Sequence, residues 1–197
     1  MSKRIGIYAG TFDPVHAGHI AFALQAIETA KLDTIYFMPE RQPRGKAGVE
    51  HFAHRVAMIK RAALPHPKFE LLEQVEARFS VERTLPKLQK QFDGAELVFL
   101  FGSDVLPEMG SWPNVERFMK HCELVVGVRA EEDIYGLELL VASWLVQPKA
   151  ITMFPSYAPS VSSSNIREAL RRRQPSHGLL QSVSRYSDQN WLYISLS

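Results

Sequence analysis

The segment GTFDPVHAGH, from Gly10 to His19, places two histidines where chemistry is most strongly indicated. His16, Gly18 and His19 follow an apolar run and fall where a helix is expected to begin. The first turn of a helix has unpaired N–H groups and a positive dipole, which together favour phosphate. Imidazoles three residues apart lie on roughly one helix face. The pair therefore predicts an anion site, the alternative being that both histidines only cap or pack the helix.

A second anion site is indicated near the other end, in SVSSSNIREAL. Ser162, Ser163 and Ser164 can cap a helix, and Arg167 lies one turn further along. A guanidinium can hold two phosphate oxygens at once. Alone, this pattern is also typical of an ordinary helix start. Combined with the histidine pair, it predicts the second half of a clamp around a polyphosphate.

Composition narrows the class of protein. The 197 residues carry 23 Lys and Arg against 21 Asp and Glu, so the formal charge is only +2, which argues against nucleic-acid binding. With 46% hydrophobic residues the chain can bury a core, and it holds no apolar run of the roughly 18 residues that a membrane span requires. The single cysteine, Cys122, is expected to be a buried and unreactive thiol. We expect a cytoplasmic protein.

Strand-length apolar runs alternate with helical patterns along the chain. Strands are expected at residues 4–10, 34–39, 68–73, 96–102, 123–128 and 150–155, and helices at 19–32, 51–64, 81–92, 115–122, 137–147 and 164–173. This alternation predicts an α/β fold: a Rossmann-like, doubly wound, mostly parallel sheet with helices on both faces. One domain over 1–197 is expected, with a C-terminal helical portion from about 162.

In such a sheet, ligands bind beyond the carboxyl ends of the strands. Gly102 ends the fourth expected strand, and Asp104 after it could accept hydrogen bonds from a ribose hydroxyl. Trp112 offers a flat face for stacking, although packing at the rim of the core is the alternative. Lys46 stands in the polar loop 40–50, where a solvated lysine is the alternative to a phosphate ligand.

GTFDPVHAGH resembles the signature of the HxGH nucleotidyltransferases, and SVSSSNIREAL is similar to their ISSTxIR motif. Over essentially its whole length the chain resembles the bacterial nicotinate (nicotinamide) mononucleotide adenylyltransferases of NAD biosynthesis. The resemblance implies an enzyme that transfers AMP from ATP to nicotinate or nicotinamide mononucleotide, releases pyrophosphate and uses Mg²⁺. Its partners would be ATP and a pyridine mononucleotide.

The resemblance also implies roles for individual residues. The ATP-binding residues would be Gly10, Thr11, Phe12, His16, Gly18, His19, Gly102, Asp104, Ser162, Ser163, Ser164 and Arg167. The catalytic residues would be His16, His19, Lys46 and Arg167. The acceptor would bind at Lys46, Phe79, Ser80 and Trp112. Asp13 is expected to fix the turn, and no dedicated metal ligands are expected.

The segment RFSVERTLPKL departs most from the family, whose pattern there is close to SYTxDTL. Phe79 and Ser80 occupy the positions of its Tyr-Thr pair, but Arg83 makes the alignment of the following residues with the family pattern ambiguous. Because the family uses this segment for the pyridine end, the choice between nicotinate and nicotinamide stays open. Two alternatives follow: an HxGH nucleotidyltransferase with another phosphate acceptor, or an ATP-binding module without turnover. A homo-oligomer is also left open.

Overall fold

The computed structural model describes residues 2–43, 45–129, 133–158 and 160–194. Six strands form its sheet: β1 (Arg4–Gly10), β2 (Thr34–Pro39), β3 (Phe69–Leu71), β4 (Glu96–Gly102), β5 (Cys122–Val128) and β6 (Ala150–Pro155). They lie in the order β3-β2-β1-β4-β5-β6, and every neighbouring pair is parallel. The direction of winding reverses between β1 and β4, which is where open α/β sheets bind ligands.

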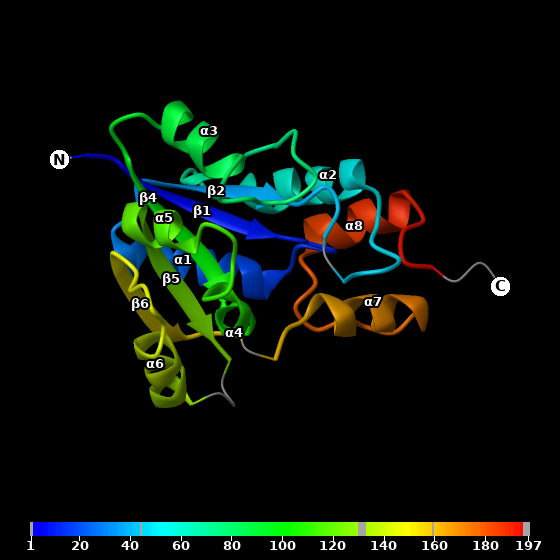
Figure 1. Ribbon diagram of the computed structural model, residues 1–197. Coiled ribbons are helices and arrows are strands. Elements are labelled where there is room, and N and C mark those ends of the chain that lie inside the picture. The colour runs from blue at the N-terminus through cyan, green and yellow to red at the C-terminus, as the bar shows by residue number, and fades with distance from the viewer. Residues whose placement is uncertain (1, 44, 130–132, 159, 195–197) are drawn as a thin grey trace.

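Helices connect the strands in a regular alternation (Figure 1). They are α1 (Ala17–Ala30), α2 (Phe52–Ala63), α3 (Thr84–Gln91), α4 (Leu106–Met109), α5 (Val115–His121), α6 (Ile134–Ala142), α7 (Ser163–Arg171) and α8 (Gln181–Gln189). A single 3₁₀ turn, η1 (Ser103–Val105), joins β4 to α4. In Figure 1, α7 and α8 lie beyond the carboxyl end of β1, near where the sheet reverses.

The sheet separates two hydrophobic layers. One contains buried residues of α1, α2 and α8, and the other contains those of α3, α4, α5 and α6. Along β4, Val98 and Leu100 belong to the first layer, whereas Leu97, Phe99 and Phe101 belong to the second. A strand buried on both faces needs a continuous apolar run, which explains ELVFLFG. The predicted doubly wound α/β fold is confirmed.

The structure differs from the expected elements in three places. The helix expected from residue 81 begins at Thr84, because the Ser80 main-chain N–H donates to Thr84 Oγ1 (3.0 Å) and holds residues 80–84 in a turn. The helix expected at 137–147 begins at Ile134, where Asp133 accepts from the N–H of Tyr135 (3.0 Å) as an N-cap. The short segment η1 and α4 was not anticipated, since four helical residues show no periodicity.

Cys122 is buried, and burial raises the pKa of its thiol to about 12, so the expected unreactive cysteine is confirmed. Within the described ranges, no helix combines the length and the apolar character needed to cross a membrane.

Candidate active site

A cleft of about 860 Å³ lies at the carboxyl ends of the central strands. Every residue that the sequence predicted to contact ATP or the acceptor lines it. The first turns of α1 and α7 both belong to its wall, so two helix N-termini face the same space. Helix N-termini attract anions, and two of them around one cleft form a site suited to a polyphosphate.

The loop after β1 is shaped by Phe12, which has a left-handed φ of 51°. Its ring is 1% exposed and packs edge-on against Tyr8 and His19. A Cβ on Gly10 would lie 2.9 Å from this ring, so the glycine makes room for Phe12. Gly10 itself is the last residue of β1. Only the main chain of Phe12 can face a ligand.

His16 and His19 stack at the N-terminus of α1, with ring centroids 3.7 Å apart and planes inclined by 28°. The main-chain N–H of His16 donates to His19 Nδ1 (3.2 Å). With Nδ1 accepting, a neutral His19 carries its hydrogen on Nε2 and can donate from there. A Cβ on Gly18 would lie 3.0 Å from the His16 ring, so any larger residue at this position would press against the imidazole.

Burial keeps both imidazoles neutral. It lowers the pKa of His16 to about 4. The pKa of His19 lies well below its ordinary value, first through burial and then through repulsion from His16 and Lys46. At neutral pH the two rings therefore present neutral hydrogen-bond donors, held in place before any ligand binds.

The predicted cap of α7 is confirmed in its geometry. Ser162 is the N-cap, and its hydroxyl accepts from the N–H of Asn165 (3.1 Å). The Ser163 hydroxyl is turned instead toward the loop after β1, where it donates to the carbonyl of Pro14 (3.0 Å). The cap thus fixes the start of α7 and joins it to the opposite wall of the cleft.

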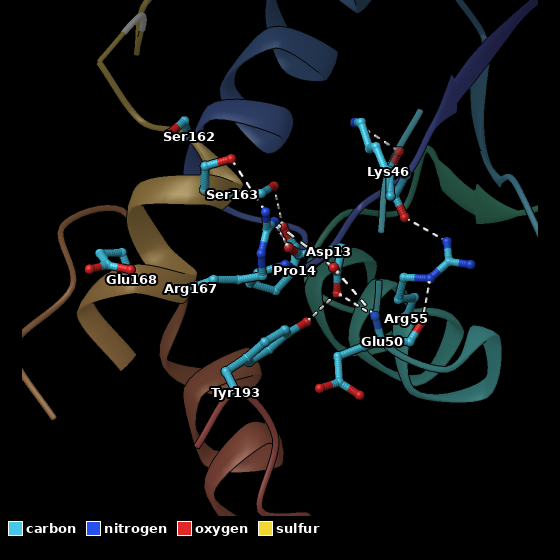
Figure 2. Close-up of polar contacts among 12 residues, drawn as sticks. Asp13, Pro14, Lys46, Glu50, Arg55, Ser162, Ser163, Arg167, Glu168 and Tyr193 are labelled. Carbon is cyan, nitrogen blue, oxygen red and sulfur yellow. Dashed lines mark hydrogen bonds and ion pairs between the residues drawn. The ribbon is translucent and has the colours of Figure 1, made fainter. Parts of the chain in front are cut away.

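Arg167 reinforces that link, as Figure 2 shows. Its Nη1 donates to the carbonyl oxygen of Asp13 (2.7 Å), and its Nη2 donates to Ser164 Oγ (3.3 Å). The side chain is still 24% exposed and lines the cleft. The guanidinium is thereby held between the two helix N-termini, where it can bind phosphate oxygens.

The loop between β2 and α2 forms another wall. The exposed side chain of Lys46 reaches across to donate to Thr11 Oγ1 (3.0 Å). Arg55, 1% exposed, donates to the carbonyl oxygens of Thr11 (2.7 Å), Glu40 (2.7 Å) and Glu50 (3.0 Å). Arg55 had no predicted place in the site, yet it fixes two loops of the cleft. An arginine on the buried face of a helical pattern was the signal available for it.

Two predicted nucleotide contacts follow β4. Asp104 lies in η1 with an exposed carboxylate at the cleft. A Cβ on Gly102 would stand 2.5 Å from Asp104 Oδ1, so the glycine leaves room for that carboxylate. Both residues are therefore placed where a ribose or base could approach the end of the strand.

The predicted acceptor residues gather in one part of the wall. Trp112 packs against the rings of Phe79, Phe101 and Phe118, with centroid separations of 6.1, 5.8 and 6.0 Å, and is half-buried. Ser80 stands beside Phe79 on the cleft. The indole is thus supported by aromatic rings and also lines the cleft.

Asp13 and Tyr193 form a contact that sequence reasoning did not find. The Asp13 carboxylate is 2% exposed, and the Tyr193 hydroxyl donates to its Oδ1 (2.7 Å). The N–H of Glu50 lies 3.4 Å from both carboxylate oxygens. Asp13 was expected to fix its turn, but no local pattern indicates a partner 180 residues away.

Among the described residues, no group of three or more His, Cys, Asp or Glu side chains is placed to hold a metal ion. The carboxylate of Asp13 is enclosed by Tyr193 and Glu50, and the other acidic residues that line the cleft are Glu40, Asp104 and Glu108.

The chain is similar to known proteins over most of its length. Residues 7–169 match the model of the cytidylyltransferase-like family. A probable nicotinate-nucleotide adenylyltransferase of Coprothermobacter proteolyticus is 34% identical over 98% of this chain and 96% of its own length. The nicotinate-nucleotide adenylyltransferase of Bacillus subtilis is 29% identical over 98% of this chain and 100% of its own length.

Solved structures share the fold. The Plasmodium falciparum nicotinic acid mononucleotide adenylyltransferase complexed with APC has a TM-score of 0.77 at 18% identity, covering 97% of both chains. The complex of the same enzyme with NaAD also has a TM-score of 0.77, at 19% identity. The match of the family model over most of the chain, and a full-length relative above 30% identity, show that the chain belongs to the cytidylyltransferase-like family.

Proposed function

We infer that the protein is a nicotinate-nucleotide adenylyltransferase, which transfers AMP from ATP to nicotinate mononucleotide in NAD biosynthesis. One structural observation carries the inference: the N-termini of α1 and α7, with His16, His19 and Arg167, face a single cleft. The full-length similarity to enzymes of that name supports nicotinate mononucleotide as the acceptor.

The chemistry is a direct phosphoryl displacement. An oxygen of the acceptor's 5′-phosphate attacks the α-phosphorus of ATP, and a new P–O bond forms as the bond to the β-phosphate oxygen breaks. That oxygen keeps the electron pair, so pyrophosphate leaves as an anion. Because the acceptor phosphate is ionised near neutral pH, the enzyme needs no nucleophile of its own. It must align two anions and stabilise charge on the leaving group.

The clamp residues divide that task. His16 and His19 supply neutral hydrogen-bond donors to triphosphate oxygens at the N-terminus of α1. Arg167 supplies a fixed positive charge from α7, and Lys46 supplies another from the loop after β2. These roles are supported by the position of all four side chains around one cleft.

Mg²⁺ enters as part of the substrate. The described residues offer no cluster of ligands for a resident ion, which fits a metal held by phosphate oxygens and water, as is usual for Mg²⁺. When bound, it neutralises charge on the triphosphate. Asp104 is one of the acidic residues that line the cleft, and its carboxylate could contact the water ligands of the ion or accept from a ribose hydroxyl as the sequence predicts.

The acceptor is proposed to bind at the aromatic part of the wall, its pyridine ring against the indole of Trp112. Aromatic rings stack with an attraction beyond that of buried area alone. Phe79 packs against the indole, and Ser80 adds a hydroxyl to the same part of the wall. Cytoplasmic location and a homo-oligomer stay predictions.

The test is pyrophosphate release with Mg²⁺ in four combinations: ATP or CTP as donor, with nicotinate or nicotinamide mononucleotide as acceptor. We expect turnover with ATP, and a kcat/KM for nicotinate mononucleotide at least about tenfold above that for the nicotinamide form. Faster turnover with nicotinamide mononucleotide would reverse the specificity. Release with neither acceptor, despite ATP binding, would favour another phosphate acceptor or a module without turnover.

A further inference from the structure

The buried carboxylate of Asp13 faces groups from three separate segments. Tyr193 Oη, from the segment after α8, lies 2.7 Å from Oδ1, and the N–H of Glu50 lies 3.4 Å from both oxygens. Arg167 Nη1, from α7, lies 3.9 Å from Oδ2. Figure 2 shows Asp13 between these partners, with the Tyr193 ring reaching it from below and the start of α7 lying above. Of these side-chain and main-chain contacts, only the phenol makes a short hydrogen bond.

Two oxygens of Asp13 lie near the guanidinium of Arg167. Its Nη1 donates to the carbonyl oxygen of Asp13, yet the carboxylate of the same residue lies close enough to compete for the guanidinium. A buried carboxylate that lacks donors draws in the nearest cation, because leaving it unsatisfied is costly. Burial and Asp13 raise the pKa of Tyr193, so its hydroxyl remains a donor throughout the physiological range.

We propose that Tyr193 is a positioning residue, whose hydroxyl satisfies the Asp13 carboxylate and so leaves the Arg167 guanidinium free to bind the triphosphate. The inference rests on the proposed function of Arg167 as a phosphate ligand. Through this contact the segment after α8 would affect ATP binding, although Tyr193 does not itself line the cleft. Without the hydroxyl, Arg167 would turn from the main-chain oxygen of Asp13 to its carboxylate.

Tyr193→Phe removes that one hydroxyl and keeps the ring, which is 7% exposed in the core. The matched control is Tyr186→Phe in α8, which removes a hydroxyl bonded to His54 Nδ1 (2.9 Å) away from the cleft. Thermal unfolding of both variants shows that each folds. The dissociation constants for Mg-ATP alone and for nicotinate mononucleotide alone are then measured by calorimetry at neutral pH.

We expect Tyr193→Phe to weaken ATP binding about tenfold, with acceptor binding within about twofold of wild type. Tyr186→Phe should change neither constant. The decisive variant combines Tyr193→Phe with Asp13→Asn, which removes the charge that would capture Arg167. This double variant should bind ATP at least about threefold more tightly than Tyr193→Phe alone.

Wild-type ATP affinity in Tyr193→Phe would overturn the proposal. An equal loss for ATP and acceptor would also overturn it, since that indicates disturbance of the whole cleft. If ATP binding weakens but Asp13→Asn restores nothing, the hydroxyl only supports the loop, and the proposal again fails. Because ATP binding is measured without transfer, a wrong acceptor assignment would leave this result interpretable.

Discussion

At the scale of single residues, the stacked histidines show how burial prepares a phosphate site. Both rings lie in a poorly solvated position at a helix N-terminus, and both stay neutral in the free protein. Hydrogen-bond donors that are already held in place in a poorly solvated site can bind an anion without reorganising. The cost of this arrangement is sensitivity to acid.

That sensitivity predicts a pH dependence of stability. The folded-state pKa of His16 is about 4 against an ordinary value of 6.5, so the unfolded chain binds the proton first. Stability from neutral His16 is therefore complete above about pH 6.5 and is lost toward pH 4, at about 1.4 kcal/mol per pH unit. Urea unfolding at pH 7.5 and pH 5 should show wild type losing roughly 2 kcal/mol more than His16→Gln. Equal losses would mean that His16 is not buried as described.

Trp112 carries the prediction for the acceptor. Trp112→Ala should raise the KM for nicotinate mononucleotide about tenfold or more and leave the KM for ATP within about threefold, because a stacking face is lost only at the pyridine end. Trp144→Ala is the matched control, since this half-buried indole lies against Gly110 and does not line the cleft. If both KM values move together in Trp112→Ala, the stacking role is wrong.

At the scale of elements, the cap of α7 holds one side of the phosphate site. Ser162→Ala removes the hydrogen bond from the Asn165 N–H and should cost about 1 kcal/mol of unfolding free energy. Because the same end of α7 carries Ser163 and, one turn further along, Arg167, kcat/KM for ATP should fall about fivefold or more.

Asp133→Ala provides the comparison for that variant. It removes the equivalent cap from α6, whose Asp133 side chain accepts from the N–H of Tyr135 and lies outside the cleft. We expect a similar loss of stability in urea unfolding and unchanged kinetics. An equal fall in kcat/KM in both variants would show that activity follows overall stability rather than the start of α7.

Some elements of the fold could be predicted from the sequence and others could not. The six strands could be predicted because parallel strands covered on both faces are continuously apolar, as β4 is. The start of α3 could not be predicted. The helical pattern begins at residue 81, but a hydrogen bond between Ser80 and Thr84 holds the first of these residues in a turn. The helix α4 is too short for any periodicity to register.

At the scale of the whole molecule, the site is a product of topology. Parallel strands bring the loops after β1, β2 and β4 to one edge, so motifs far apart in the sequence meet in one cleft. The signature around His16 and the serines of α7 could be found from local residue types. The contacts by which Arg55 and Tyr193 hold the loops of the site could not be found in the same way, because they are hydrogen bonds to residues distant in the sequence.

If the N-termini of α1 and α7 together hold the triphosphate for adenylyl transfer, His19→Ala should remove a donor that the reaction needs. We would measure kcat/KM for pyrophosphate release from Mg-ATP and nicotinate mononucleotide in wild type, His19→Ala and His54→Ala. Circular dichroism would check that each protein is folded. His54 is the control because it contacts Tyr186 outside the cleft.

His19→Ala should lower kcat/KM by at least about a hundredfold, as expected when one preorganised donor to the transition state is lost. His54→Ala should stay within about twofold of wild type. If folded His19→Ala keeps a rate within about threefold of wild type, His19 takes no part in the reaction and the proposed role of the α1 N-terminus is wrong.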